Sequence, residues 1–171
     1  VAEGFTVNAA AAYTDAKLTA NYCGETDTSG VPITVCPVDS IAFPDGPQAP
    51  SGTRLPVTPK FKANLTARYE FDWKDFDTFV QGSMVGQTST YSDLRTTESG
   101  ILGKQAGYIT FDVSSGIARD SWSISAFITN LTDERASTSR FVQCAEAVCA
   151  DKVYVIPNKP RTFGVKFGQK F

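Results

Sequence analysis

The side chains with most scope for chemistry in this sequence are four cysteines, Cys23, Cys36, Cys144 and Cys149. An even number of cysteines is typical of proteins that mature in an oxidising compartment, where they pair as disulfides. A zinc site is disfavoured, because neither close pair has the two-residue spacing of a zinc knuckle and the sequence has no His. Free structural thiols remain the alternative to disulfides.

The lack of His also limits catalysis, because it removes the usual general base and any Ser-His-Asp arrangement. Asp72, Asp75 and Asp77 lie close together in the sequence, but such a group is typical of a solvated turn. No glycine-rich phosphate loop occurs. The net charge of −2 gives no sign of a nucleic-acid partner. We therefore expect no enzyme, no cofactor and no metal site.

The elements that position these residues are predicted to be long strands. In residues 61–73 every odd position is apolar, whereas the even positions carry four charges, at Lys62, Arg68, Glu70 and Asp72. An alternation of this length exceeds a soluble strand of about five or six residues and fits a strand that crosses an outer membrane. Weaker alternation occurs elsewhere, and Phe79 interrupts it. The strands are expected at about 4–21, 61–73, 76–88, 107–118, 122–131 and 160–171.

The connections between these strands are alternately long and short. Long loops are expected at 22–60, 88–107 and 132–159, and tight turns near 73–76 and 119–121. Outer-membrane barrels have long extracellular loops and short periplasmic turns, a sorting that a soluble sheet does not need. The pattern predicts an all-β fold, an antiparallel meander of about six transmembrane strands whose two ends are periplasmic. Both expected disulfides, Cys23–Cys36 and Cys144–Cys149, then lie within extracellular loops.

Aromatic residues recur at the strand ends that should lie at the periplasmic interface, where rings with an apolar body and a polar edge are favoured. This predicted aromatic girdle consists of Phe5, Trp73, Phe76, Trp122 and Phe171. No apolar run is long enough for a transmembrane helix. The chain opens at Val1 without Met or a basic segment, so we expect it to begin within a longer protein.

The last strand resembles the C-terminal signal of outer-membrane barrel proteins, which the barrel-assembly machinery reads. Phe163, Val165 and Phe167 share one face, and the chain ends at Phe171. An unpaired strand edge with a terminal aromatic ring suits recognition by strand addition. The alternative is an ordinary edge strand of a soluble protein.

Four short motifs extend this resemblance to one family. They are Tyr-Thr-Asp-Ala at 13–16, Leu-Pro-Val-Thr-Pro at 55–59, Asn-Leu-Thr-Asp-Glu-Arg at 130–135 and Pro-Arg-Thr-Phe-Gly at 160–164. Their types and order resemble those of TonB-dependent outer-membrane receptors. The third motif departs from the family pattern, because Ala136 stands where Tyr is usual.

The resemblance implies a barrel of about 22 strands, plugged by an N-terminal domain, that imports scarce large nutrients such as iron–siderophore complexes. This chain would be its C-terminal part, without the plug. The implied partners are outer-membrane lipid, the barrel-assembly machinery, the remaining strands and plug of the same protein and, through that plug, the TonB system. No substrate-binding residue is predicted. A general porin or structural barrel is the main alternative; an outer-membrane enzyme and a soluble β-sandwich binding module are further ones.

Overall fold

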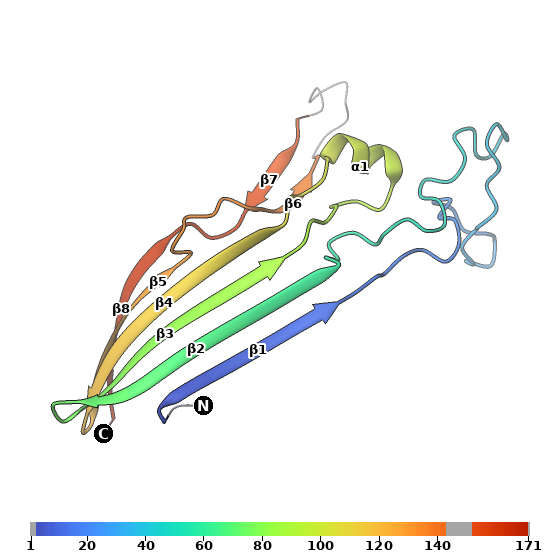
Figure 1. Cartoon of the computed structure of the whole chain (residues 1–171). Coiled ribbons are helices and arrows are strands. Elements are labelled where there is room, and N and C mark those ends of the chain that lie inside the picture. Colours follow the sequence, from blue (N-terminus) through green and yellow to red (C-terminus); the bar gives the residue numbers. More distant parts are fainter. Residues whose placement is uncertain (1–2, 143–151, 171) are drawn as a thin grey trace.

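The structure is a computed structural model that describes residues 3–142 and 152–170. Six strands form one antiparallel sheet in the order β1-β2-β3-β4-β5-β8 (Figure 1). Their bounds are β1 Phe5–Tyr13, β2 Phe61–Trp73, β3 Phe76–Gln87, β4 Tyr108–Arg119, β5 Trp122–Thr129 and β8 Thr162–Gln169. The predicted all-β antiparallel meander is therefore confirmed. Among the described residues, no helix has the length and apolar character needed to span a membrane.

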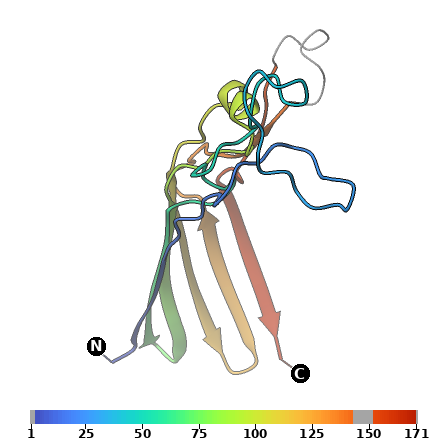
Figure 2. The same ribbon diagram turned by 90° about the vertical axis from the view of Figure 1, so that its right-hand side faces the viewer.

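Long and short connections are sorted to opposite ends of the sheet, as Figure 2 shows. The loops after β1, β3 and β5 lie together at one end, here called the loop end. The tight turns β2–β3 and β4–β5 lie at the other, here called the turn end, beside both ends of the described chain. Backbone bonds fix these ends: Glu70 N donates to Gly4 O at 2.8 Å, and Lys170 N donates to Ser121 O at 2.7 Å.

The register aligns the alternation of all six strands, so the sheet has one apolar and one polar face. Ala67, for example, pairs with Val7 on one side and Gly82 on the other. Large side chains of the apolar face are exposed and include Phe5, Val7, Leu65, Tyr69, Val80, Phe111, Val113, Ile124, Phe163, Val165 and Phe167. Such a face suits lipid, because its exposed side chains are apolar. A slip of one residue in any strand pair would turn the apolar residues of that strand to the opposite side.

The first strand is shorter than predicted. It ends at Tyr13 rather than near 21. Beyond it, the chain meets the segment before β2 only through scattered contacts, such as Thr14 N to Lys60 O at 2.9 Å. The physical reason is that Pro56 and Pro59 in that facing segment cannot donate to a β-ladder. The other predicted strand bounds differ from the structure by no more than two residues.

Two of the long loops contain regular structure. Helix α1, Thr96–Leu102, lies between β3 and β4. Strands β6, Ser137–Phe141, and β7, Tyr154–Pro157, form a separate hairpin between β5 and β8 (Figure 1). Helix α1 is a short mixed sequence and β6 is polar, so neither shows a period that could have been recognised.

Candidate functional site

The polar face of the sheet carries a compact group around Arg68. Its Nε donates to Glu70 Oε1 at 2.8 Å, and its Nη1 donates to Gln81 Oε1 at 3.3 Å. The guanidinium also lies over the Phe79 ring, 3.8 Å from the centroid. The charge of Arg68 is thus both paired and stacked. Phe79, which interrupts the sequence alternation, belongs to this polar face.

Two hollows occur over this face. The larger, of about 770 Å³, is lined in part by Arg68, Glu70 and Asp77 near the turn end. The smaller, of about 370 Å³, lies between Arg68 and Lys166 and includes Asp112. Because charged and polar side chains line both hollows, the face suits water or a polar protein surface rather than hydrocarbon.

Glycines allow two aromatic rings to lie flat against this polar face. Phe79 pairs directly with Gly116, and Phe127 pairs directly with Gly164. A Cβ at Gly116 would lie 2.6 Å from Phe79 Cε1, and one at Gly164 would lie 2.2 Å from Phe127 Cζ. Lys166 Nζ lies 5.2 Å from the centroid of Phe127. Each ring thus covers a glycine on the neighbouring strand and has a cation near it.

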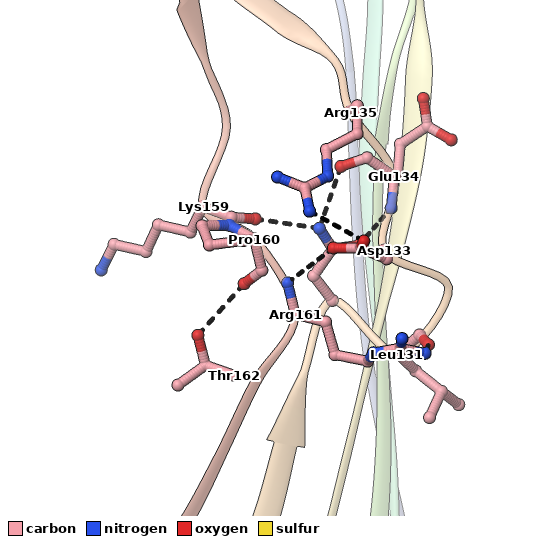
Figure 3. A network of polar contacts seen from close by, with 9 residues as sticks. Leu131, Asp133, Glu134, Arg135, Lys159, Pro160, Arg161 and Thr162 are labelled. Carbon is pink, nitrogen blue, oxygen red and sulfur yellow. Dashed lines mark hydrogen bonds and ion pairs between the residues drawn. The ribbon is translucent and has the colours of Figure 1, made fainter.

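The neck of the loop between β5 and β8 is closed by Asn130, which bonds to Glu134 and Lys159, two of the residues labelled in Figure 3. Its side-chain Nδ2 donates to Glu134 O at 3.0 Å and to Lys159 O at 2.9 Å. Its Oδ1 accepts a bond from Glu134 N at 2.9 Å, and its own N–H donates to Asp112 Oδ1 at 2.8 Å. Asn130 is 4% exposed, and its φ of 51° is one that Asn tolerates well. Every polar atom of this buried side chain is satisfied.

Asp133 completes the same network (Figure 3). Its Oδ1 accepts a bond from Arg161 N at 2.9 Å, and its Oδ2 pairs with Arg135 Nη2 at 2.9 Å. The bond from Arg161 N, with help from Arg135, holds the pKa of Asp133 below its ordinary 3.8. The third and fourth sequence motifs therefore contact each other, although they are far apart in the sequence.

The neck of the loop between β3 and β4 has a buried polar cluster. Thr90 Oγ1 donates to Gln105 Oε1, and Gln105 Nε2 donates to Ser92 Oγ. Arg140 of β6 joins it, because its N–H donates to Ser92 Oγ at 2.8 Å and its Nη1 donates to Leu102 O at 3.1 Å. The cluster ties α1 to the β6–β7 hairpin.

A cleft of about 470 Å³ lies between α1 and β6 at the loop end. Its lining mixes apolar side chains, such as Ile101 and Phe141, with charged ones. Arg95 pairs with both Asp93, at 3.0 Å, and Glu98, at 2.7 Å. The hydrogen bonds from Arg95 hold the pKa of Asp93 below its ordinary value. Apolar walls with a few fixed polar groups are typical of a surface that binds a ligand.

The loop between β1 and β2 contains a disulfide that joins Cys23 to Cys36, the pairing expected from the sequence. Cys23 and Cys36 are both buried. The loop docks on its neighbour through Thr96 N, which donates to Gln48 O at 2.8 Å. Cys144 and Cys149 lie outside the described residues, and their pairing stays a prediction.

Most residues of the predicted aromatic girdle gather at the turn end. Trp73 pairs with Phe76 across the β2–β3 turn, and the Phe76 and Trp122 rings meet edge to face at 5.9 Å. Phe5 is the first residue of β1 and pairs with Tyr69. Phe171 is outside the described residues. The predicted assembly-signal side chains Phe163, Val165 and Phe167 project from β8, each at least 68% exposed.

Within residues 3–142 and 152–170, no group of three or more His, Cys, Asp or Glu side chains could hold a metal ion. The free edges of β1 and β8 lie at the two sides of the sheet. The sheet therefore has an apolar face and a polar face, and its loop end carries structured loops.

A sheet of long antiparallel strands, apolar on one face and polar on the other, with long loops at one end and tight turns at the other, is a section of an outer-membrane β-barrel wall. A family model described as "TonB dependent receptor-like, beta-barrel" matches residues 2–131, and this chain belongs to that family. No protein of curated function matches the chain.

The solved structures that share the fold include the following three receptors. The siderophore receptor PiuA from Acinetobacter baumannii is 20% identical, with a TM-score of 0.63 over 98% of this chain and 19% of its own. The ferric-catecholate import receptor Fiu from E. coli K12, in a closed form, is 15% identical and has a TM-score of 0.63. The match covers 100% of this chain and 19% of the receptor. The ferric yersiniabactin uptake receptor FyuA from Yersinia pestis is 22% identical and has a TM-score of 0.58. The match covers 69% of this chain and 17% of the receptor. This chain thus spans less than a fifth of these receptors.

Proposed function

We propose that this chain is the C-terminal part of the barrel of an outer-membrane transporter that imports a large, scarce nutrient such as an iron–siderophore complex. The observation that carries the proposal is the family match along a sheet whose two faces are segregated by register. The similar structures are a siderophore receptor, a ferric-catecholate import receptor and a ferric yersiniabactin uptake receptor, and they support this class of substrate.

In this proposal the loop end is extracellular, and the turn end and both chain ends are periplasmic. The apolar face contacts lipid, with Trp73, Phe76 and Trp122 at headgroup level. Phe163, Val165, Phe167 and Phe171 form the signal that the barrel-assembly machinery reads. The loop end would meet the nutrient first, and the cleft of about 470 Å³ beside α1 is a hollow at that end.

The polar face lines the interior of the barrel and lies against the plug, which the TonB system would move. Arg68, stacked and paired, contributes a polar surface to that wall without a free charge. The chain's part in transport is therefore to contact the nutrient at the loop end and to form part of the wall that encloses the plug. The proposal assigns it no covalent chemistry.

Uptake of a labelled ferric siderophore tests the function. The complete receptor is produced in iron-starved cells that have or lack TonB. We expect saturable uptake that disappears without TonB. Uptake that persists without TonB and does not saturate would indicate a porin instead.

The assignment of the two faces has its own test. Ala67 lies on the apolar face near the middle of β2, where an Arg in lipid costs about 2–4 kcal/mol. Arg68, its neighbour, is the matched control on the other face. We expect Ala67→Arg to lower the heat-modifiable folded fraction of the receptor far more than Arg68→Ala. The reverse order would show that the faces are inverted.

A further inference from the structure

The register of each strand pair must be fixed, because a one-residue slip would exchange the lipid and interior faces. Tight turns fix it for two pairs. Lys74 and Asp75 both have positive φ, 49° and 65°, as in the two-residue turns that match strand twist, and Asp120 has φ 54° in the other turn. The pairs β1–β2, β3–β4 and β5–β8 are joined by long loops, which place no such constraint.

Two of these three pairs have a ring over a glycine instead. Phe79 covers Gly116 in β3–β4, and Phe127 covers Gly164 in β5–β8. Any side chain at Gly164 would meet the ring, since a Cβ there lies 2.2–2.9 Å from three ring carbons. By contrast, a Cβ at Gly82 of β3, which pairs with Ala67 on the apolar face, meets nothing within 4 Å.

A shift of β8 by two residues would keep its faces but would break this contact. Phe127 would then stand opposite Thr162 or Lys166 rather than Gly164. Both have side chains where the ring now lies. Among the described register and the two shifts by two residues, the ring therefore fits only the described one.

The neck of the loop supplies a second constraint on the same pair. Asn130 Nδ2 bonds to carbonyls at both ends of the loop, Glu134 O at 3.0 Å and Lys159 O at 2.9 Å. Asp133 Oδ1 holds Arg161 N at 2.9 Å, just before β8 begins at Thr162. These bonds bring the long connection together at its base, so that β8 starts at a fixed place beside β5.

We propose that Asn130, Asp133 and the contact of Phe127 with Gly164 set the register of β8 against β5, in the place of a tight turn. The three residues and Gly164 thereby decide which side chains of the last strand face lipid. This inference rests on the proposed function, because it assumes that the sheet is assembled as a barrel wall.

Disulfide trapping in the complete receptor tests the register. Ala126 pairs with Val165 on the apolar face, away from the residues in question. Ala126→Cys with Val165→Cys reports the described register, and Ala126→Cys with Phe163→Cys or Phe167→Cys reports a slip of two residues. Outer membranes are oxidised, and the linked peptides are identified by mass spectrometry, which separates them from the natural cysteines.

Asn130→Asp is the sharpest change, because Asp has the same size and also tolerates positive φ but lacks both donors. We expect the ratio of slipped to in-register cross-links to rise by about tenfold, from the loss of two hydrogen bonds. An unchanged ratio in Asn130→Asp would contradict the role of the neck.

Gly164→Val tests the ring contact, with Gly82→Val as the matched control. We expect Gly164→Val to lower assembly several-fold and Gly82→Val to leave it near normal. Adding Phe127→Ala to Gly164→Val should restore assembly and raise the slipped cross-links, because the clash and the constraint are both removed. The inference is overturned if both valine variants behave alike, or if the double variant shows only the Ala126–Val165 link. A receptor that keeps its register but does not import would contradict the proposed function alone.

Discussion

The two ends of the sheet are ordered by different kinds of contact. At the turn end, residues that are neighbours in sequence meet, as Trp73 and Phe76 do across Lys74 and Asp75. At the loop end, order depends on side chains that join residues far apart, such as Asn130 and Lys159, which are 29 positions apart. A single sheet thus combines a locally determined end with one that is determined by tertiary contacts.

Burial follows the same division. The buried side chains of the described residues lie in the loops and at their necks: Cys23, Cys36, Ala49, Thr90, Leu102, Gln105, Asn130 and Ala136. The strands themselves keep both faces accessible in this open sheet. The loop end therefore has small cores of its own, and we expect the core around the Cys23–Cys36 disulfide to be lost without unfolding the wall.

The largest effect that separates the two ends is expected from the disulfide. Cys23 and Cys36 are 13 positions apart in the sequence, and replacing both with Ser opens the loop that their disulfide closes. A disulfide that closes a loop of about 15 residues stabilises by about 3 kcal/mol. We expect protease to cleave within 24–35 much faster, while the heat-modifiable mobility of the receptor stays normal. Loss of the folded barrel would show that the two ends are not separable.

A smaller effect is expected at the neck between β3 and β4. Gln105→Leu leaves the buried Thr90 Oγ1 without its acceptor, which costs about 1–3 kcal/mol, and removes one of the two donors to Ser92 Oγ. Hydrogen exchange in α1 should accelerate. Gln169→Leu, at an exposed position of β8, is the control and should leave exchange in α1 unchanged.

At the turn end, a change of backbone preference should matter more than any loss of contact. Asp75→Val places a β-branched residue at φ 65°, which costs about 1–2 kcal/mol. Asp75→Gly should be neutral or slightly stabilising. Urea unfolding of the receptor in detergent measures both, and equal midpoints would show that the turn does not constrain β2–β3.

The smallest expected effect is a pH dependence at the loop end. The pKa of Asp133 is lowered by its bond from Arg161 N, so its contribution to stability is present above pH 3.8 and is lost as pH falls below that value. Asp133→Asn should remove this dependence. Unfolding of both proteins in urea between pH 7 and pH 3 measures it; parallel curves would contradict the expectation.

The sequence predicted the elements whose pattern is local. The bounds of β2 came from strict alternation between Phe61 and Trp73, and the structure has the same bounds. The early end of β1 could have been inferred from Pro56 and Pro59, but the facing segment was not known from the sequence. Phe79 interrupted the pattern because its partner, Gly116, lies on another strand.

The candidate site was less accessible to prediction. Asn130 and Asp133 were recognised as parts of a motif, but their role depends on Lys159 and Arg161, which local periodicity does not connect to them. Arg140 contacts the neck between β3 and β4 from the β6–β7 hairpin, which the sequence pattern did not predict. Polar networks of this kind are specified by three-dimensional proximity, so a single sequence reveals their members without their partners.

The closed neck at Asn130 separates the segment beyond the two stems of this loop from the wall, so we expect that segment to tolerate replacement. Asn158 N donates to Ala136 O at 2.9 Å just above the Asn130 bonds, so the two stems leave the wall side by side whatever segment joins them. Chain closure becomes more costly only slowly with length, by about 0.6 kcal/mol for each doubling. We therefore expect insertions between these stems to leave the wall beneath with its sequence and shape.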